Sequence, residues 1–245
     1  MTRRALLMSN GWAPGFGYLE HALPAIRNIL NDAKRIAFVP YAQRDVDRHT
    51  AVIAAAMAPL GVHVVGVHTD RDPRSVIESA DAIMIGGGNA FRLLQAMQVA
   101  GLVAVITAAA HEGKPYIGIS AGTNVACPTI RTTNDMPIVW PETLSALGLI
   151  PFQINAHYPV GFGDGIHHGV TRDKRLVEFL EENDAPVLAL EEGSWVYVDD
   201  ELATVGGAAG GRLFRREHAN METPPGTDVS FLMNSVPAFD ELNPD

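Results

Sequence analysis

The chain has 245 residues, of which 47% are hydrophobic, and carries a formal net charge of −10. This length and hydrophobic content suit one α/β domain with a well-filled core. The acidic balance argues against nucleic acid and anionic membranes as main partners. A single cysteine, Cys127, excludes an intrachain disulfide and is typical of a reducing compartment. The amino-terminal apolar run stops at Ser9, too short for a signal peptide, so we expect a cytoplasmic protein with no membrane segment.

Short apolar segments alternate with amphipathic ones over the first half of the chain. The apolar segments are rich in Val, Ile, Leu or Met, which is typical of buried parallel strands. Strands are predicted at residues 5–9, 35–40, 62–67, 82–85 and 116–119. Helices are predicted at residues 18–31, 48–58, 90–100 and 103–112. This alternation predicts a flavodoxin-like α/β fold, with a doubly wound, mainly parallel sheet and helices on both faces.

The last third of the chain has a different pattern. Three short strands are predicted at residues 186–190, 194–198 and 202–205, with charged turns between them. We expect them to form a short antiparallel extension at a sheet edge. From Glu222 onward the sequence contains several prolines and little periodicity. Residues 222–245 are therefore expected to form a surface or mobile tail of a single domain that spans residues 1–245.

The segment Gly118-Ile119-Ser120-Ala121-Gly122 matches the G-x-S-x-G pattern of a nucleophile elbow. It follows a predicted strand and precedes small residues that can begin a helix, which is the context that the elbow requires. The flanking glycines relieve crowding at the sharp turn, and the N–H of Ala121 would face a developing oxyanion. The pattern and its context predict Ser120 as a nucleophile. The competing interpretation is a glycine-rich turn with an incidental serine.

A second glycine cluster, Gly86-Gly87-Gly88-Asn89, also follows an apolar strand and opens a helix. Its N–H groups are suited to a second oxyanion donor. Glycine loops before helices also bind phosphate, but neither G-x-G-x-x-G nor G-x-x-x-x-G-K-S/T is present. The cluster therefore favours an oxyanion loop over a nucleotide site.

Histidine is the usual general base for a serine nucleophile, and the chain has nine histidines. His157 is favoured because a short apolar segment leads into a turn there, as at a strand end. His218 would complete the serine, acid, histidine order of an α/β-hydrolase, but its flanks are highly polar and we disfavour it. His167 and His168, near Asp164, suggest a metal site with His157. Neighbouring histidines in a strand diverge and no zinc motif is present, so no metal is predicted.

Two carboxylates are candidates for orienting the histidine. Glu192 follows the apolar segment 186–190 and precedes Gly193, at a predicted strand end. Asp135 lies between the serine and the histidine in sequence, shortly before Pro137. Each has an ordinary alternative as a surface or turn residue, and the physics of the residues alone does not distinguish them.

Several segments together resemble the peptidase E family, the α-aspartyl dipeptidase group of serine peptidases. The matching segments are 85–94 (IGGGNAFRLL), 118–126 (GISAGTNVA), 132–139 (TTNDMPIV), 146–155 (ALGLIPFQIN) and His157-Tyr158. Weaker matches lie at 17–21 and 169–175, and the resemblance ends at about Gly193. One departure is Ala156, where the family commonly has proline, and its loss loosens the backbone before the histidine.

The resemblance implies hydrolysis of dipeptides with an N-terminal aspartate, without a metal or an organic cofactor. It implies a fold similar to class I glutamine amidotransferase domains, with serine in place of their cysteine. The roles implied are Ser120 as nucleophile, His157 as base, Asp135 or Glu192 as orienting acid, and Gly88 and Ala121 as oxyanion donors. Strand-end geometry favours Glu192 as the acid.

An aspartate-specific site must pair the substrate carboxylate, and bidentate arginine suits that role. Arg131 and Arg172 are the candidates, and Asn89 is a further candidate for substrate contact beside the glycine loop. Two alternatives stay open: a non-catalytic amidotransferase-like binding domain, and a cyanophycin-type peptidase with a different acidic substrate. The sequence does not determine the oligomeric state, and a homodimer is compatible with it.

Overall fold

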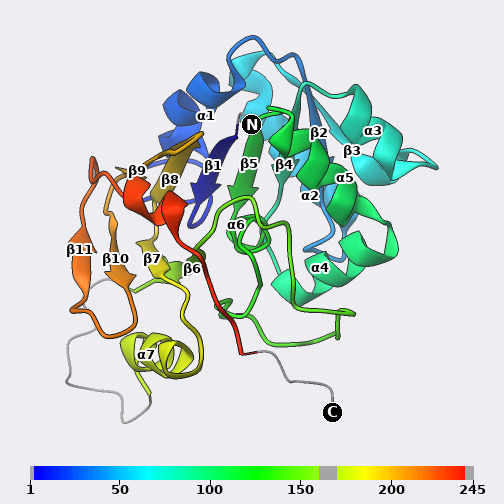
Figure 1. Cartoon of the computed structure of the whole chain (residues 1–245). Helices are drawn as coiled ribbons and strands as arrows, with labels where there is room; N and C mark the ends of the chain where they lie inside the picture. Colours follow the sequence, from blue (N-terminus) through cyan, green and yellow to red (C-terminus); the bar gives the residue numbers. More distant parts are fainter. Residues whose placement is uncertain (1–2, 160–169, 241–245) are drawn as a thin grey trace.

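The computed structural model describes residues 3–159 and 170–240. Within these ranges the strands form two β-sheets, with helices packed around them (Figure 1). The larger sheet has the order β3-β2-β4-β5-β1-β8-β9, and the smaller sheet has the order β11-β10-β7-β6. The strands of the larger sheet are β1 (Arg4–Met8), β2 (Arg35–Val39), β3 (His63–Gly66), β4 (Ala82–Ile85), β5 (Tyr116–Ile119), β8 (Ser194–Asp199) and β9 (Leu202–Gly207). Those of the smaller sheet are β6 (Gln153–Tyr158), β7 (Val187–Glu191), β10 (Gly211–Phe214) and β11 (Met221–Thr223).

The strands β3, β2, β4, β5 and β1 pair in parallel, as the apolar segments predicted. The bounds predicted for β4 and β5 agree with the structure. Strands β8 and β9 then pair antiparallel beyond β1, so the sheet is mixed and the predicted α/β class is confirmed. The strand predicted at 186–190 does not join this sheet. It is β7, which lies between β6 and β10 in the smaller sheet.

The helices are α1 (Leu23–Leu30), α2 (Val46–Met57), α3 (Pro73–Ser79), α4 (Ala90–Val99), α5 (Leu102–His111), α6 (Ala121–Asn124) and α7 (Arg172–Glu182). Asp45 accepts a hydrogen bond from the Arg48 N–H and so starts α2 two residues before the predicted position. Helix α3, which the sequence pattern did not predict, is capped by Asp72 through the Arg74 N–H. In the described residues no single helix is long and apolar enough to cross a membrane. Helices α4 and α5 together have the length and apolar composition of a membrane-spanning segment, but the chain bends by 94° at the break between them.

Alternate residues of the parallel strands enter two hydrophobic clusters, one on each face of the larger sheet. Along β1, Leu6 and Met8 belong to one cluster and Leu7 belongs to the other. Helices α1 and α2 cover the first face, and α3, α4, α5 and α6 cover the second. The covering residues are respectively Ile26, Ile53, Val76, Leu93, Ile106 and Ala121. Helix α7 packs separately on the smaller sheet (Figure 1), where Leu176 and Leu180 share a hydrophobic cluster with Val187.

Residues 222–240, expected to form a surface or mobile tail, are held against the fold at several points. Thr223 of β11 pairs with β10, and the Val229 N–H donates to the Ala203 carbonyl oxygen at 2.8 Å. The short 3-10 helix Ser230–Asn234 buries Leu232 in the main core. Residues 241–245 lie outside the described residues.

Candidate active site

Ser120 stands between β5 and α6, in the strand–turn–helix context that the sequence predicted. Its backbone has φ 52° and ψ −107°, a strained conformation for a residue with a side chain. The Ser120 N–H donates to the Met8 carbonyl oxygen at 3.0 Å. A Cβ on Gly122 would clash with the Ile85 carbonyl oxygen, so only glycine lets the turn approach β4 this closely. Tyr116 donates its hydroxyl to the Gly122 carbonyl oxygen at 2.5 Å and ties the turn to β5.

His157 lies near the end of β6, where the β6–β7 register shifts between Asn155 and Tyr158. Its φ of 57° is in the left-handed region, which is unusual for a non-glycine residue. The irregularity turns the ring toward the larger sheet, and Nε2 lies 2.8 Å from the Ser120 Oγ. The predicted strand-end position of His157 is therefore what brings it to the serine.

Glu192 occupies the turn between β7 and β8. Its Oε1 lies 2.9 Å from the His157 Nδ1. Serine, imidazole and carboxylate thus form a continuous hydrogen-bonded line. The side chains of His157 and Glu192 are 42% and 61% exposed, so a small molecule can reach this line from solvent.

The Asp135 carboxylate has hydrogen-bond partners other than His157. Its Oδ2 accepts the Ala90 N–H at 2.7 Å, at the first residue of α4, and the Thr133 hydroxyl at 3.1 Å. Asn89 caps the same helix by accepting the Arg92 N–H at 3.0 Å. The structure therefore places Asp135 at the start of α4, beside the glycine cluster, and places Glu192 at the histidine.

The glycine cluster runs alongside Ser120. A Cβ on Gly87 would lie 3.3 Å from the Ser120 Cβ. Gly88 has φ +143° and packs on the Ala42 carbonyl, where a side chain would clash. The Asn89 N–H donates to the same Ala42 oxygen at 3.0 Å. Among the described residues no acceptor pairs with the N–H groups of Gly88 or Ala121, which leaves both available to a ligand oxygen.

The two predicted arginines have different surroundings. Arg131 donates to the Asn183 Oδ1 at 3.1 Å and the Asp240 carbonyl oxygen at 2.8 Å, so its guanidinium fastens the carboxyl-terminal segment. Arg172 is the first residue of α7, and its Nη1 is buried with no hydrogen-bond partner in the described part of the chain. Burial lowers the pKa of Arg172, the like charge of Arg175 lowers it further, and the nearby Tyr158 opposes the shift.

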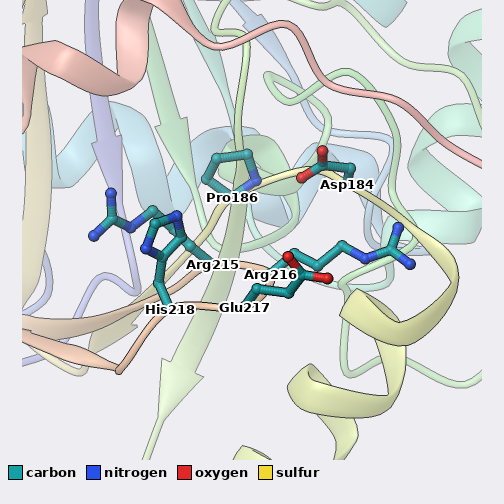
Figure 2. Close-up of a pocket in the computed structure, with 6 residues that line it drawn as sticks. All are labelled: Asp184, Pro186, Arg215, Arg216, Glu217 and His218. Carbon is teal, nitrogen blue, oxygen red and sulfur yellow. The ribbon is translucent and has the colours of Figure 1, made fainter.

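The remaining candidates do not join this site. His218 lines a separate pocket of about 570 Å³ with Asp184, Pro186, Arg215, Arg216 and Glu217 (Figure 2). Because Phe214 pairs with Val187, this pocket lies at the end of β7 opposite Glu192. Burial raises the pKa of the Cys127 thiol to about 12, which keeps it protonated.

The metal site that the sequence suggests involves residues outside the described ranges. His167, His168 and Asp164 lie outside the described residues. Across residues 3–159 and 170–240, no group of three or more His, Cys, Asp or Glu side chains is arranged to hold a metal ion.

Two residues at the site were missed in the sequence. Ser9 and Asn10 follow β1, whose carboxyl end meets the carboxyl end of β5. The Ser9 Oγ accepts the His157 N–H at 2.8 Å, and the Asn10 Oδ1 accepts the Gly193 N–H at 2.8 Å. Polar residues directly after a parallel strand are the signal that would have identified them.

Comparisons with known proteins show the family to which the chain belongs. Residues 5–206 match peptidase family S51. The chain is 50% identical over 235 residues to "Peptidase E" of Streptomyces coelicolor, covering 96% of this chain and 97% of that protein. It is 42% identical over 234 residues to "Probable alpha-aspartyl dipeptidase" of Drosophila melanogaster, covering 94% and 98%. A solved peptidase from an acI-B1 actinobacterium superposes with a TM-score of 0.67 at 17% identity, over 94% of this chain and 98% of that one.

The chain is therefore a peptidase, and it belongs to peptidase family S51. The resemblance predicted from its motifs is confirmed. The solved structure shows that the fold is shared.

The His49 ring, on α2, packs against Gly86 of the glycine cluster. Its Nδ1 lies 3.1 Å from the Pro40 carbonyl oxygen, and a Cβ on Gly86 would clash with its ring. Its Nε2 is buried and has no partner among the described residues. Burial lowers the pKa of His49 from its ordinary 6.5, and the bond to Pro40 only partly opposes this. The imidazole is thus neutral and donates from Nδ1.

We expect the free energy of unfolding to fall as the pH drops through 6.5, because protonated His49 would be a buried, unpaired charge. The folded-state pKa lies below the unfolded one, so this stability is present above pH 6.5 and is lost below it. Urea unfolding at about pH 7.5 and about pH 5.5 measures how far the free energy of unfolding falls between the two pH values. This fall should be smaller in His49→Gln than in the unaltered chain. His63→Gln, at an exposed position, is the control. Equal losses in all three proteins would contradict this role.

Proposed function

We propose that the protein is a serine dipeptidase that hydrolyses dipeptides with an N-terminal aspartate. The observation that carries the proposal is the hydrogen-bonded line from the Ser120 Oγ through the His157 imidazole to the Glu192 carboxylate. Membership of peptidase family S51 supports peptide hydrolysis. The name of the Drosophila relative supports a dipeptide substrate with an aspartate, and the name of the Streptomyces relative supports a peptidase.

The chemistry follows from the geometry. His157 Nε2 takes the Ser120 hydroxyl proton while Oγ attacks the scissile carbonyl carbon. Glu192 accepts the Nδ1 proton of His157 in a hydrogen bond, which presents Nε2 to the serine and stabilises the imidazolium. The imidazolium then protonates the leaving amine, and an acyl-enzyme remains on Ser120. Water, deprotonated by His157, then attacks the ester carbonyl carbon. The imidazolium returns the proton to the Ser120 Oγ as the acyl C–O bond breaks, and aspartate is released.

The oxyanion is assigned to two backbone donors from different segments of the chain. Ala121 follows the nucleophile at the amino end of α6, and Gly88 belongs to the loop beside Ser120. Both N–H groups lack an acceptor in the described part of the chain, which suits them to the negative charge that develops on the carbonyl oxygen. Asp135 contributes indirectly, because it holds the first residue of α4 directly after this loop.

Recognition of the substrate carboxylate is assigned to Arg172. Its buried guanidinium nitrogen has no partner in the described residues, and the nearby Tyr158 directly follows His157 in β6. A half-buried cation with an unpartnered donor gains from a ligand carboxylate. Arg131 is occupied by Asn183 and Asp240, so we assign it to holding the carboxyl-terminal segment. Asn89 remains a candidate for substrate contact.

We further propose that the five parallel strands are a flavodoxin-like doubly wound unit within a single domain. Their order β3-β2-β4-β5-β1 is the flavodoxin order 2-1-3-4-5 with the amino-terminal strand in the last place. The net charge of −10 argues against nucleic acid and anionic membranes as partners. The single cysteine, which is typical of a reducing compartment, supports a cytoplasmic location. A homodimer is compatible with the proposal.

We expect Glu192→Gln to lower kcat by about 10²- to 10⁴-fold, because a glutamine amide can donate to Nδ1 and stabilise the wrong imidazole tautomer. Asp135→Asn keeps an oxygen for the Ala90 N–H, so it should cost less than about 1 kcal/mol of stability and leave kcat nearly unchanged. Steady-state kinetics of both variants, with Ser120→Ala as the inactive reference, measure this. A larger loss in Asp135→Asn than in Glu192→Gln would transfer the orienting role to Asp135.

We expect Asp-Leu to be hydrolysed faster than Asn-Leu, Ala-Leu and Leu-Asp. Arg172→Met should reduce the kcat/KM ratio of Asp-Leu to Asn-Leu by about 10- to 100-fold, the loss expected for one charged hydrogen-bonded pair. Arg131→Met is the matched control and should keep the ratio. An unchanged ratio in Arg172→Met would reject this residue as the carboxylate partner, and equal rates for all four dipeptides would reject aspartate specificity.

A further inference from the structure

The last residue of β1 and the two residues that follow it contact all three chain segments that carry the hydrogen-bonded line. The Met8 carbonyl oxygen accepts the Ser120 N–H at 3.0 Å. The Ser9 Oγ accepts the His157 N–H at 2.8 Å. The Asn10 Oδ1 accepts the N–H of Gly193, directly after Glu192, at 2.8 Å. Three consecutive residues at the carboxyl end of β1 thus hold the serine, the histidine and the turn that carries Glu192.

We propose that Ser9 and Asn10 are positioning residues that hold His157 and Glu192 in line with Ser120. The proposal rests on the serine peptidase mechanism above, because it assigns these side chains to the alignment of that line. Neither side chain contacts the reacting atoms in the mechanism. Both act through the backbone N–H groups that they accept.

The position of Ser9 explains why a hydroxyl is needed there. Ser9 extends the larger sheet, where its N–H donates to the Ser194 carbonyl oxygen at 2.9 Å. Its hydroxyl donates to the Leu190 carbonyl oxygen at 2.9 Å and accepts from His157. Leu190 and His157 belong to β7 and β6 of the smaller sheet. One buried hydroxyl therefore links the two sheets at the histidine.

The irregularity in β6 makes this contact necessary. The β6–β7 register shifts at His157, so the regular ladder does not take up its N–H. A polar backbone group without a partner is costly to bury, and Ser9 is fully buried. The hydroxyl satisfies the N–H while the residue keeps its left-handed φ of 57°. Without the Ser9 hydroxyl, we expect His157 to relax to a backbone conformation with negative φ. That change would turn its ring away from the Ser120 Oγ.

The test compares Ser9→Ala with Ser230→Ala. Ser230 is the matched control because its Oγ also accepts a backbone N–H, from Ala203 at 2.9 Å, and it lies on the far side of β9 from the active site. We expect Ser9→Ala to lower kcat for Asp-Leu by about 10²-fold, as for a catalytic group displaced by about 1 Å. KM should change by less than about threefold, since no substrate contact is lost. Ser230→Ala should keep both constants.

A second readout does not depend on the substrate. The rate at which a small fluorophosphonate labels Ser120 should fall in Ser9→Ala in parallel with kcat and stay unchanged in Ser230→Ala. If the unaltered chain is labelled at Ser120 but Ser9→Ala is labelled equally fast, the positioning role is wrong. If the unaltered chain is neither labelled nor active, the proposed serine mechanism itself fails.

A second pair of variants covers the case in which Ser9→Ala does not fold. Asn10→Ala removes the acceptor for the Gly193 N–H, whereas Asn10→Asp keeps a side-chain oxygen in that place. We expect kcat to fall by about tenfold or more in Asn10→Ala and to recover most of that loss in Asn10→Asp. Equal kcat in Asn10→Ala and the unaltered chain would overturn the proposal.

Discussion

The hydrogen bond between the Ser120 Oγ and the His157 Nε2 spans two sheets, and the active-site architecture depends on it. Ser120 leaves β5 of the larger sheet, and His157 leaves β6 of the smaller one. Both residues have positive φ, at 52° and 57°. Each such conformation costs on the order of 1–3 kcal/mol and persists only where its surroundings hold it. The strain is thus concentrated at the two residues that must meet.

Close packing between backbone segments holds Ser120 in its strained conformation. Gly122 lies against the Ile85 carbonyl, and Gly87 lies beside Ser120 itself. A side chain at either position would push the elbow away from β4 and from the glycine cluster. The N–H groups of Gly88 and Ala121, which have no acceptor among the described residues, belong to these two closely packed segments. The packing that stabilises the turn therefore also supports the proposed oxyanion site.

The sequence predicted the parts of this arrangement that depend on local chemistry. The elbow at Ser120 and the bounds of β4 and β5 follow from short apolar strands that end at glycine or serine. The partner of His157 could not be predicted from residues alone, because it depends on β7 joining β6 rather than the main sheet. Ser9 was missed for the same reason, since its contacts lie 148 and 181 residues away along the chain.

The most direct test is to map the residue modified by a small fluorophosphonate, using mass spectrometry of the digested protein. We predict a single adduct, on Ser120, that is lost in His157→Ala while the fold is retained. That result would show that the serine reacts because the histidine of the smaller sheet activates it. An unmodified Ser120, or undiminished modification of Ser120 in His157→Ala, would contradict the activation of this serine across the two sheets.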